Sequence, residues 1–273
     1  MWGTTTVIPG AATLFFVTAD GWALTCKHVA SQLPFADQLL QTFNAFKAER
    51  AQLPTGKKFR HTLRALERKY GYSNGTPVEM YNNFADCVDG PLELEARLHP
   101  SVDVALIKFN NFTQLGASSF PIFAQQGQDL KQGMFLCRLG FPFPEFTNFE
   151  YDSATDRIRW TSTGRLDTPR FPIEGMVTRH LVGPAGVFGF ELSTPGLRGQ
   201  SGGPAFDSQG RVWGMQAATN HLDLDFDVDM DVLRTGQKRR VKDSAFLHVG
   251  HCIHVDVLKQ FMRDNGVIFQ EAA

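Results

Sequence analysis

Cysteine is scarce in this chain of 273 residues. The four cysteines, Cys26, Cys87, Cys137 and Cys252, lie far apart and include no Cys-x-x-Cys pair. Each lies in or near an apolar stretch, where a small buried thiol is the usual state. The pattern disfavours a disulfide-rich secreted domain and favours a reducing compartment.

Neither sign of charge predominates, and no long apolar run is present. The chain has 27 Lys and Arg against 28 Asp and Glu, a net charge of -1, so no overall field attracts nucleic acid or an anionic membrane. The apolar runs are too short to span a membrane, and the first residues lack the regions of a secretory signal. We therefore expect a cytoplasmic protein with neither nucleic acid nor membrane as a partner.

A glycine-rich loop around Ser201 is the most distinctive segment. Residues 196–207 read GLRGQSGGPAFD, which places one serine in a backbone built largely from glycine. Such a loop exposes a hydroxyl and points successive main-chain N–H groups at one position, as the stabilisation of a tetrahedral oxyanion requires. The segment predicts that Ser201 is the nucleophile of a hydrolase.

A serine nucleophile needs a base and a carboxylate that orients the base. Residues 17–30 are typical of a strand, an Asp-Gly turn and a second strand, with His28 just beyond its end. Residues 99–109 place Asp103 at the start of an apolar run that predicts a buried strand. His28 and Asp103 are therefore the candidate base and orienting group.

The loop also fits the Gly-x-Ser-x-Gly pattern of the α/β-hydrolases, which is a competing interpretation. That fold needs a helix directly after the serine, with its Asp and His downstream. In this chain Gly202, Gly203 and Pro204 follow, and residues 206–212 favour a hairpin. The sequence therefore disfavours the α/β-hydrolase fold.

The order His28, Asp103, Ser201 in these contexts resembles the chymotrypsin-fold (trypsin-like) serine proteases, most nearly their bacterial HtrA-type branch. The matching segments are residues 25–30, 103–108, 140–142, 199–204 and 250–258. The resemblance implies a serine endopeptidase that acts through an acyl-enzyme without a cofactor. It assigns His28 as general base and then acid, Asp103 as its orienting carboxylate and Ser201 as the acylated residue, with the N–H groups of Gly199 and Ser201 as the oxyanion hole.

Gln200 precedes the serine, where digestive members of that family carry an aspartate that pairs with a newly cut N-terminus. Glutamine cannot form this ion pair. The resemblance therefore implies activation by loop ordering or by a partner rather than by removal of a pro-peptide. No PDZ-like segment is expected after the catalytic unit.

The fold class implied is mostly β: two six-stranded antiparallel β-barrels with a helical insertion in the first barrel and a C-terminal helix. We expect one peptidase unit over residues 1–273, with the first barrel at 1–125, its insertion at 31–98, the second barrel at 126–254 and the helix at 255–273. Apolar spacing predicts helices near 39–50, 61–70 and 256–265, the last stopping at Gly266. The predicted strands are 4–8, 13–18, 22–25, 92–98, 104–110, 134–139, 157–163, 187–193, 204–206, 212–217 and 247–253.

The resemblance also indicates an S1 pocket, which would hold the substrate side chain before the cleaved bond. Its base and walls would come from Pro195, Gly196, Gln216, Ala217, Thr219, Gly250 and Cys252. The base of the pocket has no aspartate, so a Lys or Arg side chain of the substrate would find no carboxylate to pair with. We expect a small or medium apolar residue there.

Two further sequence patterns, a cluster of His and Cys and an alternating Asp segment, suggest other functions. His248, His251, Cys252 and His254 suggest a metal site, but strand alternation puts His251 on the opposite face, so no metal is expected. Residues 222–232 alternate between apolar and aspartate, which predicts a strand rather than a calcium loop. The basic residues 237–240 could pair with it; the alternative is an acidic surface for a substrate or an edge that binds a partner.

The insertion at 31–98 is either a solvated elaboration of the barrel or a lid or docking surface. Besides its protein or peptide substrate, the chain could thus bind a regulatory protein through this insertion or through the acidic strand at 222–232. A catalytically silent protease-like scaffold and a dedicated effector protease activated by a partner remain the alternative functions.

Overall fold

The computed structural model describes residue 8 and residues 10–273, apart from residues 57, 74, 85, 86, 91, 153 and 156 and the side chain of Arg234. Its elements confirm the expected fold class, a mostly β chain of the chymotrypsin type with a C-terminal helix. The predicted strand at 4–8 lies, except for residue 8, outside the described residues. None of the described helices has the length and apolar character needed to cross a membrane.

Of the six strands expected for the first barrel, four are found among the described residues, as an antiparallel sheet in the order β1-β2-β5-β4. Its strands are β1 (Phe15–Phe16), β2 (Trp22–Thr25), β4 (Glu93–Leu98) and β5 (Ala105–Asn110). Gly21 in the β1–β2 turn has a φ of 96°, and a Cβ there would lie 2.5 Å from the Phe109 carbonyl oxygen, so the turn requires glycine. A separate ribbon pairs β3 (Val88–Asp89) with β6 (Gln114–Leu115).

The second β unit closes on itself. Strand order β13-β8-β11-β12-β15-β14, with an additional β13–β14 pairing, makes the expected six-stranded barrel. Its strands are β8 (Phe135–Arg138), β11 (Ile173–Gly183), β12 (Gly186–Leu192), β13 (Pro204–Phe206), β14 (Arg211–Arg234) and β15 (Gln237–His254). Strands β7 (Ile122–Phe123) and β16 (Gln270–Glu271) add to it in parallel after β14.

The prediction that residues 157–163 belong to the second barrel is wrong. They form β10 (Arg157–Trp160), which pairs with β9 (Phe149–Asp152) in a separate ribbon. The Arg157 guanidinium donates to Asn44 Oδ1 at 3.2 Å, which ties the ribbon to the helical insertion. The barrel position is taken by β11, which sequence reasoning missed because two register shifts interrupt its alternation.

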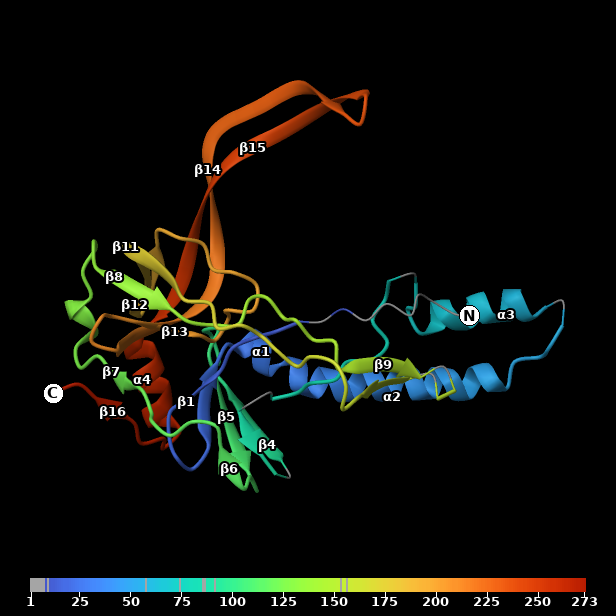
Figure 1. The fold of residues 1–273 in the computed structure, drawn as a ribbon, viewed down its shortest axis with the longest axis horizontal. Coiled ribbons are helices and arrows are strands. Elements are labelled where there is room, and N and C mark those ends of the chain that lie inside the picture. The colour runs from blue at the N-terminus through green and yellow to red at the C-terminus, as the bar shows by residue number, and fades with distance from the viewer. Residues whose placement is uncertain are drawn as a thin grey trace.

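The insertion is helical, as predicted. Helix α1 (Lys27–Ala30) leads into α2 (Gln32–Ala51), and α3 (Phe59–Lys69) follows. Figure 1 shows α2 and α3 extending sideways from the β units. Their buried side chains form a cluster separate from the barrels, made of Phe43, Phe46, Leu66 and Tyr72. The insertion is therefore stabilised largely by its own core.

The closing helix α4 (Val255–Asp264) packs on the second barrel and ends, as predicted, before Gly266, which has a φ of 71°. The short 3-10 helix η1 (Gly127–Asp129) lies on the approach to the barrel. Leu24 and Leu106 from the first sheet share one core cluster with Leu258 of α4 and with the second barrel. The junction of the two β units is thus apolar, and each buried large side chain contributes about 1.5–3 kcal/mol.

Strands β14 and β15 continue past the barrel as a long hairpin that stands away from the body in Figure 1. Of the alternatives left open for the acidic segment, the structure shows the pairing with the basic segment: Asp231 lies opposite Arg240, and the Arg240 guanidinium contacts Asp229 at 2.8 Å. The expected unbroken alternation is wrong. A bulge between Asp223 and Asp227, with Asp225 at a φ of 57°, interrupts it.

Candidate active site

His28 and Asp103 are held together where the first sheet meets the insertion. Strand β2 ends at Thr25, so that His28 falls in the single turn of α1, and Asp103 lies in the loop just before β5. The carboxylate of Asp103 accepts a hydrogen bond from the main-chain N–H of His28 at 2.9 Å and faces its ring Nδ1 at 2.7 Å. The two contacts fix both the position and the tilt of the imidazole.

The electrostatics of this pair suit a base. The hydrogen bond that the His28 ring donates to Asp103 raises the pKa of His28 above its usual range, against an opposing effect of burial. Burial works to raise the pKa of Asp103, but hydrogen bonds from the His28 ring and main chain outweigh it and hold that pKa below its usual range. A neutral His28 then carries its proton on Nδ1 toward Asp103, which leaves Nε2 free to accept one.

The loop that carries Ser201 depends on its glycines. Gly199 and Gly202 have φ values of 101° and 90°, and a Cβ on Gly202 would lie 2.1 Å from the Thr13 carbonyl oxygen. Thr13 fastens the loop by donating its N–H to the Ser201 carbonyl at 3.0 Å and its hydroxyl to the Gly199 carbonyl at 2.7 Å. Gln200 is fully buried; its side chain accepts from the Leu197 N–H at 3.0 Å. The serine is thus displayed on a rigid turn.

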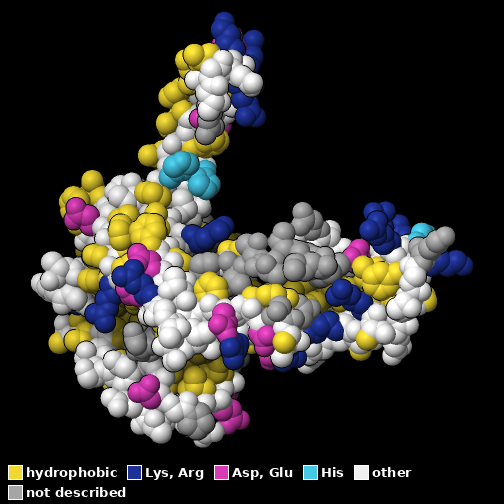
Figure 2. Space-filling model, turned by 45° about the vertical axis from the view of Figure 1, so that its right-hand side comes forward, with side chains coloured by type: hydrophobic (Ala, Val, Ile, Leu, Met, Phe, Trp, Pro, Cys, Tyr) yellow, Lys and Arg dark blue, Asp and Glu magenta, His cyan; other side chains and the backbone are white. Residues whose placement is uncertain are grey.

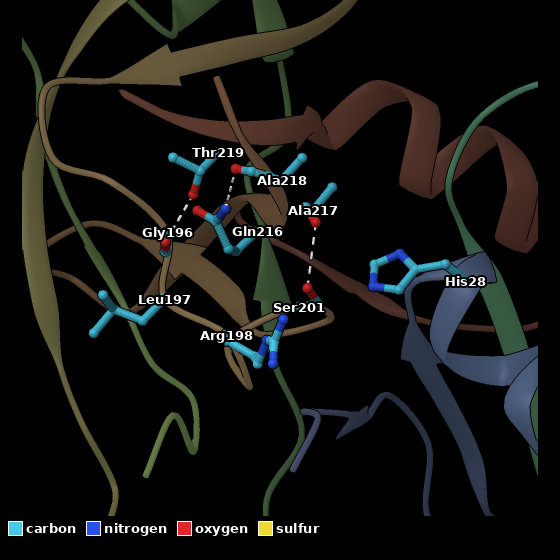
Figure 3. Close-up of a pocket in the computed structure, with 9 residues that line it drawn as sticks. All are labelled: His28, Gly196, Leu197, Arg198, Ser201, Gln216, Ala217, Ala218 and Thr219. Atoms are coloured by element: carbon cyan, nitrogen blue, oxygen red, sulfur yellow. Dashed lines mark hydrogen bonds between the residues drawn. The ribbon is translucent and has the colours of Figure 1, made fainter. Parts of the chain in front are cut away.

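Ser201 shares a pocket with His28, but its hydroxyl points elsewhere. The hydroxyl donates to the Ala217 carbonyl at 3.3 Å, and Figure 3 shows His28 to the side of this bond. No hydrogen bond between Ser201 and His28 is found in the described part of the chain. The structure therefore joins two of the three predicted catalytic residues and places the third across the same cavity. Catalytic hydrogen bonds are often unformed before substrate binds.

The pocket between them has a volume of about 290 Å³. Of the predicted S1 residues, Gly196, Gln216, Ala217 and Thr219 line it. Pro195, Gly250 and Cys252 do not line it and lie behind it: the Cys252 thiol contacts Gln216 Oε1 at 3.6 Å, and the Gly250 N–H donates to the Thr194 carbonyl at 2.8 Å. The Thr219 hydroxyl donates to the Gly196 carbonyl at 2.7 Å and so bridges the two walls.

Sequence reasoning missed several residues around this pocket. Leu197, Arg198 and Ala218 complete its lining, and Arg138 contacts its wall from behind through Gln216 Oε1 at 2.5 Å. Arg198 could have been found, since it lies three positions before the serine. Arg138 gave one weak signal, a lone charge inside the predicted apolar strand at 134–139.

Among the described residues, the side chains that converge as a potential metal-binding set are Cys26, His28 and Asp103, not the residues considered at 248–254. Burial raises the pKa of the Cys26 thiol far above its usual range, so it stays protonated and donates to the Gln216 carbonyl at 3.3 Å. Nδ1 of His28 is already engaged by Asp103. The donor set does not fit a metal ion, because a coordinating thiol must lose its proton.

The family model described as "Trypsin-like peptidase domain" matches residues 12–215, which is most of the chain. The chain belongs to the trypsin-like peptidase family. No match was found among curated proteins. Among solved structures, the chain is similar to Rv3671c from M. tuberculosis H37Rv, in a crystal structure of a serine-to-alanine mutant in an inactive form. The likeness has a TM-score of 0.44 and 15% identity, and covers 94% of this chain and 81% of that one.

Membership of the trypsin-like peptidase family makes the chain a peptidase by class. The matched range holds the His28–Asp103 pair and the glycine-rich loop with Ser201. The long hairpin tip and α4 lie beyond residue 215, outside the matched range. These outer parts are therefore features that the family model does not describe.

Proposed function

We propose that this trypsin-like peptidase is a serine endopeptidase that cleaves peptide bonds through an acyl-enzyme. The observation that carries the proposal is the 2.7 Å contact between His28 Nδ1 and Asp103, because it orients the histidine that lines the same pocket as Ser201. A histidine held in this way has its other nitrogen available to activate a nearby hydroxyl. A glycine-rich turn that displays the hydroxyl supports the same reading.

In this mechanism, His28 Nε2 takes the proton of Ser201 as Oγ attacks the scissile carbonyl carbon. The negative charge that forms on the carbonyl oxygen is stabilised by the N–H groups of Gly199 and Ser201. His28 then gives its proton to the leaving amine, and the peptide bond breaks. A water molecule repeats the sequence on the acyl-enzyme, which releases the acid and restores Ser201.

In this proposal, the structure represents a resting state. Ser201 must turn from the Ala217 carbonyl toward His28, and the Thr219–Gly196 bridge must open to admit a side chain. We propose that a regulatory protein drives this change by binding the helical insertion or the projecting hairpin, both of which extend beyond the body (Figure 1). The proposal also places the chain in the HtrA-type branch and in the cytoplasm.

The test is covalent labelling with a fluorophosphonate probe, followed by mass mapping of the adduct. We expect one adduct on Ser201, none on Ser201→Ala, and strongly slowed labelling of His28→Ala. Ser193→Ala serves as a hydroxyl control that leaves labelling unchanged. If the folded native protein gives no adduct even with peptide present, either Ser201 is locked until the proposed partner binds or the chain is a protease-like binding module rather than an enzyme.

A further inference from the structure

Arg138, at the end of β8, is a fully buried cation with neutral partners. One terminal nitrogen donates to Gln216 Oε1 at 2.5 Å; the other donates to the Thr194 carbonyl at 3.0 Å, the Thr194 hydroxyl at 2.5 Å and the Pro195 carbonyl at 3.2 Å. Its Nε is buried without a partner among the described residues. No described carboxylate lies within ion-pair distance of it, although buried arginines are almost always paired with one.

The chain makes room for this guanidinium at the back of the pocket. A Cβ on Gly250 would lie 2.1 Å from the Arg138 terminal nitrogen, so only glycine at 250 leaves the space. Gln216 links the cation to the cavity, because it accepts from Arg138 on one side and lines the pocket beside Ser201 on the other. One amide, whose nitrogen donates to the Ala218 carbonyl at 2.5 Å, therefore stands between the positive charge and the cavity.

The pocket itself holds no negative charge. None of its lining residues is an aspartate or glutamate, and a second guanidinium, that of the exposed Arg198, stands at its mouth next to Ser201 (Figure 3). The nearby Asp103 is engaged by His28. Two cations with no acidic neighbour in the lining favour an anionic occupant.

We propose that this pocket binds an acidic substrate side chain, aspartate or glutamate, on the acyl side of the cleaved bond, and that Arg138 determines this specificity. The inference rests on the proposed function and replaces the expectation of an apolar residue. The carboxylate of the substrate displaces the Gln216 amide and accepts charge-assisted hydrogen bonds from Arg138, with Arg198 closing over it. The bound acid thereby supplies the carboxylate partner that the buried guanidinium lacks.

A site built to hydrogen-bond one group discriminates strongly against a neutral analogue. For peptides that differ only at the residue before the cleaved bond, we expect kcat/KM for Glu to exceed that for Gln and for Leu by at least about 100-fold, and Lys to be the poorest. Arg138→Gln should reduce the Glu to Gln ratio to near one. Arg198→Gln should lower the Glu to Gln ratio by a smaller factor than Arg138→Gln does.

Arg159→Gln is the matched control, because Arg159 pairs with Glu150 on the β9–β10 ribbon outside the pocket. It removes the same charge and should keep the full preference for Glu. Should Arg138→Gln fail to fold, the comparison of Glu, Gln, Leu and Lys on the native protein still decides the question.

Calorimetry with the same peptides on Ser201→Ala measures the preference without catalysis. Tighter binding of the Glu peptide than of the Gln peptide supports an anionic pocket even where no turnover occurs. Fluorophosphonate labelling of Ser201 together with a preference for Leu or Lys overturns the assignment of Arg138 and leaves the endopeptidase proposal standing. Absence of labelling together with tighter binding of the Glu peptide overturns the endopeptidase proposal and leaves the assignment of Arg138 standing.

Discussion

At the scale of single residues, the contact between His28 and Asp103 governs how the proposed chemistry depends on pH. His28 acts as a base only when neutral, and its hydrogen bond to Asp103 raises its pKa. Activity should therefore fall as the pH drops through that raised pKa. Asp103→Asn replaces the charged carboxylate by a neutral amide, so the midpoint of this fall should move to lower pH and the rate above it should drop by about 10⁴-fold.

The rate of fluorophosphonate labelling against pH measures both effects of Asp103→Asn without any knowledge of the substrate. Asp20→Asn is the control, because Asp20 pairs with Lys108 at 2.6 Å on the far side of the same sheet and touches no pocket residue. A midpoint that stays in place in Asp103→Asn would mean that Asp103 does not set the titration of His28.

The residues of the candidate site differ in how well the sequence predicts them. His28, Asp103 and Ser201 each stand in a local context with its own signature: a strand end, the start of an apolar run and a glycine turn. Arg138 has no such signature. Its burial depends on the missing side chain of Gly250 and on the hydrogen bonds that its guanidinium donates to the loop at Thr194, and both positions are distant in the chain. Only the folded barrel brings these together.

At the scale of elements, the α2–α3 insertion should unfold independently of the barrels. Phe46 is completely buried in the separate cluster, where its ring packs 5.0 Å from that of Tyr72. Phe46→Ala leaves a cavity and should destabilise the insertion by about 3–5 kcal/mol. Hydrogen exchange should then speed up across residues 32–69 and stay unchanged in β8 and β12.

The exposed Phe35 on the same helix provides a matched control for Phe46→Ala. Phe35→Ala should change stability by less than about 0.5 kcal/mol, since it leaves no cavity. Faster exchange in the barrel strands, or slower labelling of Ser201, would show instead that the insertion and the barrels form one cooperative unit.

The elements also differ in how well the sequence predicts them. Helices α2, α3 and α4 and strands β2 and β13 follow from apolar spacing and turn residues. Strand β11 does not, because its register shifts near Val177 and Leu181 break the alternation that marks a strand. The β9–β10 ribbon has a strand pattern but pairs outside the barrel, and local pattern carries no information about pairing partners.

At the scale of the whole molecule, the projecting hairpin has two faces of opposite character. Aspartates on β14 meet Arg240 and Lys242 on one face, while Phe226, Val228 and Met230 remain exposed. Figure 2 shows this arm standing clear of the body, with apolar side chains along it and basic ones near its tip. The apolar side chains are left without a covering element in the described part of the chain, which is unusual for a monomer.

Removal of the arm should leave the peptidase body intact. Deletion of residues 223–246 with an Asn-Gly turn between Leu222 and Leu247 keeps a directly opposed pair on either side of a two-residue hairpin. The deleted side chains belong to none of the buried core clusters, so Tm should change by no more than about 4 °C, equivalent to about 1 kcal/mol. Ser201 should label at the native rate.

A much lower Tm would show that the arm stabilises the barrel, whereas a normal Tm with lost labelling would show that the arm orders the pocket. The expected result, an unchanged body and pocket, leaves the arm as a surface for the regulatory partner proposed above.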